Sequence, residues 1–323
     1  MNVNELKRKW KILTVPPSSG YESIRIDSVC LPDLFIGLND EANRCLILEV
    51  PEFVNVNFNR LEKENLRAFF HKKEGCVILE LLDPFYYELF NELIVSLYNV
   101  LWKISDAKKS TENFITTVNK WSAFLSSKNK KELSESEVRG LIGELICLEV
   151  LIEERNDQVI NSILSAWTGP FDETYDFELE DLIIEVKAKP FKSMEVQISN
   201  EFQLDPIPSK QLDLFVVSLI PHPRGISIED LITSIRHKIL SKGGDLTIFY
   251  SALSQKNLTP ESYIQYDNYR FKVPEFRIYN ATSELFPALR KTDFGSAFRR
   301  VRYILNLEEC TDLIIRTEET NWK

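Results

Sequence analysis

The chain carries two acidic residues and a lysine at a spacing that could serve hydrolytic chemistry. Asp176 comes first, and nine residues later Glu185 and Lys187 interrupt the apolar run "LIIEVKA". Carboxylate oxygens are the ligands that Mg²⁺ prefers, and a neighbouring ammonium group can offset charge that builds on a phosphorus centre. The same residues would also suit the solvated face of an ordinary sheet, because an acid-x-lysine triplet is common by chance. The pattern therefore depends on the elements around it.

Residues 182–188 are typical of a strand with two different faces. Alternation sends the apolar even-numbered side chains to the core face, and it sends Glu185 and Lys187 together to the other face. The residues at 178–181 can turn the chain back, which would bring Asp176 on the preceding strand toward the same end. We therefore expect the three charged groups to lie near one another.

A helix expected over 135–154 places another acid on an apolar surface. The residues three and four positions from Glu144 are small or apolar, so its carboxylate should point inward, where it is unfavourable unless paired or bound to a cation. Gly140 and Gly143 each lower helix propensity by roughly 1 kcal/mol, which fits a helix that approaches another backbone closely. Glu137 completes a capping box three residues after an N-cap serine, and we expect it to cap the helix.

Together these residues predict a divalent-cation site. Asp176 and Glu185 would supply oxygen ligands for Mg²⁺, with the backbone carbonyl of Val186 and, directly or through water, Glu144 as further ligands. Lys187 would orient or help deprotonate an attacking water and stabilise the charge of the transition state.

Length and composition allow this chemistry within a folded protein of ordinary kind. The chain has 323 residues, of which 44% are hydrophobic, so one large or two modest domains are expected. It shows no apolar run long enough for a membrane span and no leader-peptide pattern. Its five scattered cysteines indicate reduced thiols, and we expect a cytoplasmic protein with no membrane partner. No P-loop, GxSxG or dinucleotide motif is present.

The net charge of −10 is unevenly distributed. Residues 270–302 carry eight basic and three acidic residues, mixed with aromatics, which suits a DNA-backbone surface. The alternative is the wet face of an antiparallel sheet. The candidate DNA contacts are Arg270, Lys272, Arg277, Arg299, Arg300 and Arg302.

Hydrophobic periodicity predicts a mixed α/β fold. Residues 1–130 are expected to form a β-rich and helical region for partner or DNA recognition, residues 131–250 the core, and residues 251–323 an extended segment packed on that core. The expected elements are strands within 21–82, helices after 83 and over 111–126, a polar linker at 126–136, strands at 195–199 and 212–220, a short helix near 200–204, and helices at 227–240 and 244–256.

Several motifs resemble the PD-(D/E)XK nuclease superfamily, and more narrowly a PD-(D/E)XK-motif family of bacterial restriction–modification and phage-defence gene clusters. They are "GLIGELICLEVL", "WTGP", "YDF", "IEVKA" and "VQISNEFQLD". One departure is Tyr175, which stands where the superfamily motif has proline.

The resemblance implies a restriction-endonuclease-like αβββαβ core and a Mg²⁺-dependent DNA endonuclease, with Mn²⁺ as a substitute metal. It implies catalytic roles for Asp176, Glu185 and Lys187, with Glu144 beside them, and an assisting role for Gln203 after the third core strand. Expected partners are DNA, a methyltransferase or helicase/ATPase from the same gene cluster, and a second copy of the chain. The alternative is a non-catalytic DNA-binding or assembly subunit on the same fold.

Overall fold

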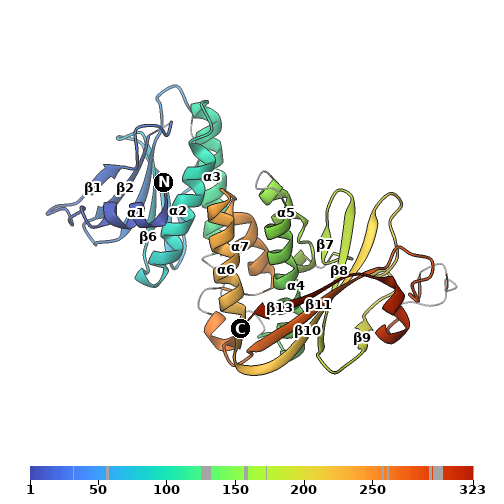
Figure 1. Ribbon diagram of the computed structural model, residues 1–323. Helices are drawn as coiled ribbons and strands as arrows, with labels where there is room; N and C mark the ends of the chain where they lie inside the picture. The colour runs from blue at the N-terminus through green and yellow to red at the C-terminus, as the bar shows by residue number, and fades with distance from the viewer. Residues whose placement is uncertain are drawn as a thin grey trace. The chain divides into compact units, whose positions relative to one another are not determined.

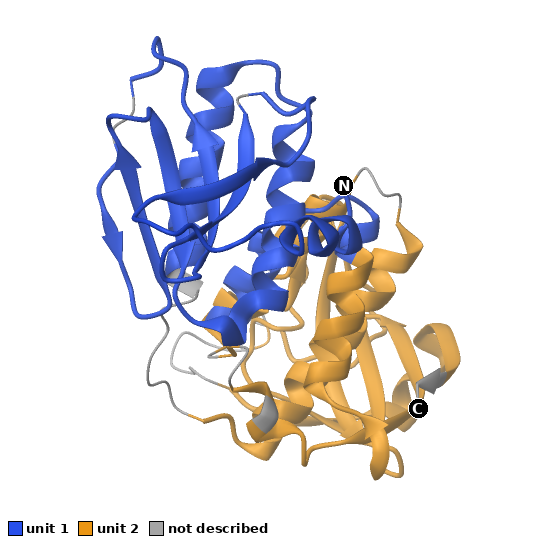
Figure 2. Cartoon of the chain, turned by 90° about the vertical axis from the view of Figure 1, so that its left-hand side faces the viewer, with its two compact units in different colours: residues 1–130, 239–254 blue, residues 131–238, 255–323 orange. Residues whose placement is uncertain are grey.

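The computed structural model describes residues 1–31, 33–55, 58–124, 132–155, 159–171, 173–256, 258–259, 262–290, 293 and 301–322. The chain divides into two compact units, one of residues 1–130 and 239–254 and one of residues 131–238 and 255–323 (Figures 1 and 2). Residues 239–254 thus belong to the first unit, and residues 255–323 belong to the second unit together with residues 131–238. In the described ranges, no helix combines the length and the apolar character that crossing a membrane requires.

The first unit combines an antiparallel sheet with helices. In chain order its elements are α1 (Val3–Trp10), β1 (Tyr21–Arg25), β2 (Leu34–Asn39), β3 (Arg44–Glu49), β4 (Leu61–Glu62), β5 (Leu66–His71), β6 (Cys76–Leu81), α2 (Tyr87–Leu101), α3 (Ala107–Phe124) and α7 (Leu246–Gln255). The strands lie in the order β1-β2-β3-β6-β5-β4. The strands expected within 21–82 are confirmed. Helices α1 and α2 are joined by a hydrogen bond from the Trp10 indole to the Asn91 side chain.

The second unit is built on a mixed sheet that carries the candidate site. In chain order its elements are α4 (Glu135–Glu154), α5 (Ile160–Ala166), β7 (Phe177–Glu178), β8 (Leu182–Pro190), β9 (Glu195–Ile198), β10 (Gln211–Ile226), α6 (Ile228–Ser241), β11 (Phe271–Asn280), β12 (Tyr303–Asn306) and β13 (Ile314–Trp322). The main sheet has the order β13-β11-β10-β8-β7. Its β8 and β10 run parallel, and its other neighbours are antiparallel. The expected mixed α/β class is confirmed.

Helix α4 lies against one face of this sheet (Figure 1). A Cβ atom added at Gly143 would lie 3.3 Å from the side chains of Val186 and Ala188 on β8. Gly143 therefore permits the close approach that its helix position suggests. A Cβ at Gly140 would meet nothing within 4 Å, so the same interpretation is wrong for Gly140.

The strand expected at 195–199 forms, but it lies outside the main sheet. β9 pairs with β12 in a separate two-stranded sheet, and β10 takes the third place in the αβββαβ order. The inward side chains of this pair, Val196, Ile198 and Leu305, pack with those of β10 on the sheet face away from α4. The helix expected near 200–204 is a turn. The predicted third core strand is therefore corrected from β9 to β10.

Candidate active site

The shortness of β7 leaves an open edge on β8 next to Glu185. β7 pairs with only the two residues of β8 that precede Glu185. Farther along this edge, the N–H of Val186 donates a 2.8 Å hydrogen bond to Oδ2 of Asp176 in place of a strand partner. The carboxylate of Asp176 thus lies against the strand that carries Glu185 and Lys187, as the motif spacing predicted.

A short segment before Asp176 holds two of the acids in place. The backbone N–H groups of Thr168 and Gly169 donate to the carbonyl of Asp176 at 2.9 and 3.0 Å. The buried indole of Trp167 donates to Oε2 of Glu144 at 2.8 Å. A Cβ atom at Gly169 would lie 2.8 Å from Oδ1 of Asp176 and 3.0 Å from Oε2 of Glu144, so both carboxyl groups face this glycine. Position 169 has room for a hydrogen and no more.

Lys187 lies between an acid and an amide. Its Nζ donates to Oε1 of Glu185 at 2.6 Å and to Oε1 of Gln203 at 3.3 Å. The same oxygen of Gln203 accepts the N–H of Ser199 at 2.8 Å. Oε2 of Glu185 is buried and has no hydrogen-bond partner among the described residues. A buried carboxylate oxygen in this state is unfavourable unless another group satisfies it.

A second lysine, which the sequence did not indicate, approaches the acids from the segment after α7. The Nζ of Lys256 lies 3.7 Å from Oε1 of Glu144. Its positive charge lowers the pKa of Glu144 and of Asp176, opposing the effect of burial. In sequence, Lys256 follows a helix in a polar stretch, "SQKNL", as many surface lysines do, so no local signal distinguishes it.

Burial controls the protonation of the acid cluster. It raises the pKa of Glu185 to about 8 and, together with the nearby Asp176 charge, the pKa of Glu144 to about 7. Burial also raises the pKa of Asp176. For Lys187 burial alone would lower the pKa, but Glu185 and Asp176 outweigh it and the pKa is raised. Lys187 therefore stays an ammonium ion, and burial makes the three carboxyl groups easier to protonate, so a bound cation would compete with protons at them.

The acids fit a magnesium ion that keeps much of its water. No group of three or more His, Cys, Asp or Glu side chains in the described part of the chain forms a ready-made metal cage. Mg²⁺ in proteins is commonly held by one or two carboxylates and several waters. The unpartnered oxygen of Glu185 and the carboxylate of Asp176 meet that requirement. Glu144, already bonded to Trp167, fits a contact through water.

These groups open into one cavity of about 930 Å³. The four residues of the predicted motif line it, and so do Gln203 and Arg302. Glu137 is also at its wall, and it caps α4 as expected, accepting hydrogen bonds from the N–H and hydroxyl of Ser134. The remaining lining residues are Ser136, Arg139, Gly140, Val186, Ala188, Pro190, Val196, Gln197 and Ser199.

The other basic residues expected to contact DNA do not line this cavity or lie outside the residues that the structure describes. Arg270 forms ion pairs with Asp230, at 3.0 Å, and with Asp267, so its charge is already balanced. Lys272 is exposed on β11, and Arg277 pairs with a glutamate two residues before it at 3.1 Å. Arg299 and Arg300 lie outside the described residues.

Lys189, two residues after Lys187, belongs to β8 and is buried. β8 continues through Pro190, and Lys189 is only 4% exposed. Its Nζ lies 3.4 Å from the carbonyl of Phe191. Burial lowers the pKa of this lysine, and its place inside the sheet makes it part of the packing.

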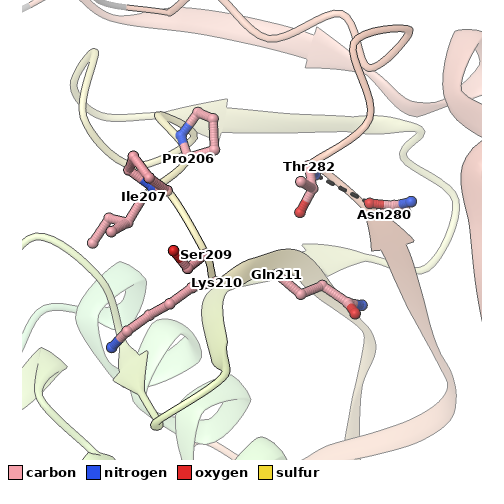
Figure 3. Close-up of a pocket in the computed structure, with 8 residues that line it drawn as sticks. Pro206, Ile207, Ser209, Lys210, Gln211, Asn280 and Thr282 are labelled. Atoms are coloured by element: carbon pink, nitrogen blue, oxygen red, sulfur yellow. Dashed lines mark hydrogen bonds between the residues drawn. The ribbon is translucent and has the colours of Figure 1, made fainter.

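A second cavity, of about 560 Å³, lies at the start of β10 (Figure 3). It contains no carboxylate, and its lysine, Lys210, is bonded to Glu178 at 2.8 Å. Asn280 and Thr282 face one another across a hydrogen bond in Figure 3. Without a carboxylate, this cavity lacks the kind of ligand that usually holds Mg²⁺ in proteins. The lining residues are Pro206, Ile207, Pro208, Ser209, Lys210, Gln211, Asn280 and Thr282.

Comparison with known families agrees with the geometry. Residues 6–308 match the model of a family described as "Putative PD-(D/E)XK family member, (DUF4420)". Neither a curated protein nor a solved structure matches the chain significantly. The matched range includes every candidate residue named for the acid cluster.

Proposed function

This chain belongs to the family described as "Putative PD-(D/E)XK family member, (DUF4420)", and we propose that it is a Mg²⁺-dependent endodeoxyribonuclease. Family membership over residues 6–308 indicates a nuclease-like function. The observation that carries the proposal is the buried, unpartnered Oε2 of Glu185 in one cavity with Asp176 and Lys187. That arrangement suits a cation, which would satisfy the unpartnered oxygen and offset the charge of the acids, beside a cavity of about 930 Å³ that can admit a substrate phosphate.

Asp176 and Glu185 would hold the metal, with the carbonyl of Val186 as a further ligand and Glu144 acting through water. When bound, the ion supplies stabilisation of the negative charge that develops on the phosphate. A water molecule gives a proton to solvent as its oxygen forms a bond to phosphorus, the ester P–O bond breaks, and the leaving oxygen takes a proton from solvent. Mn²⁺, which also accepts carboxylate and water ligands, should substitute for Mg²⁺.

Lys187 acts in this proposal as a fixed positive charge. The acids around it raise its pKa, which favours charge stabilisation and orientation of the water over removal of a proton. Gln203 keeps the ammonium group in place, because its side-chain oxygen binds both Lys187 and a backbone N–H of the same loop.

The test is the cleavage of supercoiled plasmid DNA. Wild-type protein with Mg²⁺ or Mn²⁺ should nick or cut the plasmid, and chelation of the metal should stop the reaction. Lys187→Met and Glu185→Gln should lose cleavage, whereas Lys108→Met, which removes the same charge from an exposed site on α3, should cut normally. Equal cleavage by Lys187→Met and wild type would remove Lys187 from the mechanism. DNA binding without cleavage by the wild type would favour a non-catalytic DNA-binding or assembly subunit.

We extend this proposal to a restriction or phage-defence setting, on the basis of the motif resemblance. In that setting a methyltransferase or helicase/ATPase encoded nearby would be a partner. Cells that express the wild-type gene with its neighbouring genes should then resist phage, and cells with Lys187→Met should not. Equal phage plating on both strains would count against a defence role while leaving the nuclease activity open to the plasmid assay.

A further inference from the structure

The β9–β12 pair has one face in the core and one face in solvent. Along β9 and β12, buried and exposed side chains alternate, and Val196, Ile198 and Leu305 are the buried set. Because side chains on a strand alternate between faces, the pair is a two-stranded ribbon whose outer surface is free of the sheet below. We call this pair, residues 195–198 and 303–306, the ribbon.

The outer face of the ribbon carries an unusual side-chain pair at its centre. Gln197 lies directly opposite Ile304 in the antiparallel register. Ile304 is 66% exposed, although a β-branched side chain of this size is usually buried. An exposed isoleucine beside an exposed amide adds nothing to the packing of the core, which the inward residues already supply.

The ribbon borders the candidate active site. Gln197, Ser199 and Arg302 line the same cavity as Glu185 and Lys187. Arg302, exposed just before β12, adds a positive charge at the wall of this cavity, which suits a phosphate. DNA whose backbone reaches the acid cluster would therefore meet the ribbon at the next base pairs.

One side chain links the ribbon to the catalytic lysine. Oε1 of Gln203 accepts hydrogen bonds from the N–H of Ser199, immediately after β9, and from Nζ of Lys187. A shift of the ribbon would therefore move a partner of Lys187. Contact between the ribbon and the correct bases can in this way change the position of Lys187.

We propose that the ribbon is the sequence-reading element of the enzyme, that it enters the major groove, and that the Gln197–Ile304 pair reads an A·T base pair. The major groove admits a two-stranded ribbon. A glutamine amide matches N6 and N7 of adenine, and an apolar side chain contacts the methyl group of thymine. The inference rests on the proposed function, because it assumes that DNA occupies the cavity.

The experiment selects bound sequences from a random duplex DNA library. The parent is the Lys187→Met protein, which should bind without cutting, and Gln197→Ala and Ile304→Ala are added to it singly. The matched control is Ile315→Ala, which truncates an isoleucine that is 52% exposed on β13. The parent and the control should enrich an A·T pair at a fixed position. The two ribbon variants should lose that preference by roughly 5-fold to 100-fold, as expected for one base contact, while the folded fraction by circular dichroism stays unchanged.

The outcomes separate this inference from the proposed function. If wild type cuts plasmid but the parent enriches no sequence, or the ribbon variants keep the parent's preference, the ribbon does not read bases and the nuclease proposal stands. If the two variants lose a preference for G·C, the ribbon does not read the pair proposed here. If wild type neither cuts plasmid nor binds the library, the nuclease proposal fails and this inference falls with it.

Discussion

Gly169→Ala should disable the site by adding one methyl group. The new Cβ would lie 2.8 Å from Oδ1 of Asp176, 3.0 Å from Oε2 of Glu144 and 3.3 Å from Cα of Asp176. Glycine 169 does not have a positive φ, so the backbone itself accepts alanine. The effect is therefore one of space alone.

The carboxylate of Asp176 cannot easily move away from this methyl group. Its backbone carbonyl accepts two N–H groups, from Thr168 and Gly169 itself, and its Oδ2 is held by Val186. Overpacking of this kind destabilises by about 1–3 kcal/mol. A displacement approaching 1 Å in a catalytic group can lower the rate on the order of 100-fold.

Two measurements test this reasoning. Thermal melting should show a lower Tm for Gly169→Ala and a smaller stabilisation by added Mg²⁺, and plasmid cleavage should slow by roughly 100-fold. As a control for stability, Gly140→Ala on α4 has no atom within 4 Å of its new Cβ, and it should stabilise by up to about 1 kcal/mol through helix propensity. If Gly169→Ala keeps wild-type cleavage and the same response to Mg²⁺, the placement of the two acids around Gly169 is not what positions the metal.

Three further predictions concern pH, salt and stability. Burial raises the pKa of Glu185 from 4.5 to about 8, so between these pH values this residue is ionised in the unfolded chain and protonated in the folded chain. The metal-free protein should therefore lose stability as pH rises from 4.5 to 8, and Mg²⁺ should stabilise it increasingly over the same range. In thermal melts over this range, Glu185→Gln should flatten both curves. Arg302→Ala should reduce the slope of log K against log salt for DNA binding, measured by fluorescence anisotropy, by about 1. Arg270→Ala should leave this slope unchanged, because the charge of Arg270 is paired with two aspartates. Equal slopes for wild type and Arg302→Ala would contradict a phosphate contact by Arg302. Glu80→Ala in the first unit removes the carboxylate that accepts hydrogen bonds from Tyr21, Asn39 and Arg67. Denaturant unfolding should therefore show a free energy of unfolding lower by about 3–5 kcal/mol. A decrease below about 1 kcal/mol would mean that water replaces the carboxylate.

Local patterns in the sequence predicted most of the elements and the faces of the side chains in β8 and α4. The apolar alternation of residues 182–188 placed Glu185 and Lys187 on the same face of a strand. The neighbours of Glu144 predicted its inward direction, and the serine–glutamate pair at 134 and 137 predicted the start of α4, which the structure confirms. The capping box of Asn2 and Glu5 is a signal of the same kind for α1, which no expectation included. Such features depend on residues within a turn or two of one another, so sequence contains them directly.

The tertiary structure alone decided which distant groups meet. β9 pairs with β12, although more than a hundred residues separate them in the sequence. The periodicity of a strand does not specify so distant a partner, because any exposed strand edge offers the same backbone donors and acceptors. Lys256 lies near Glu144 because the chain returns to the second unit after α7. A residue without a side chain is needed at position 169 because the carboxyl groups of Asp176 and Glu144 both face it. Charge and residue type indicated the chemistry of this site, but its geometry came from pairings that only the folded backbone defines.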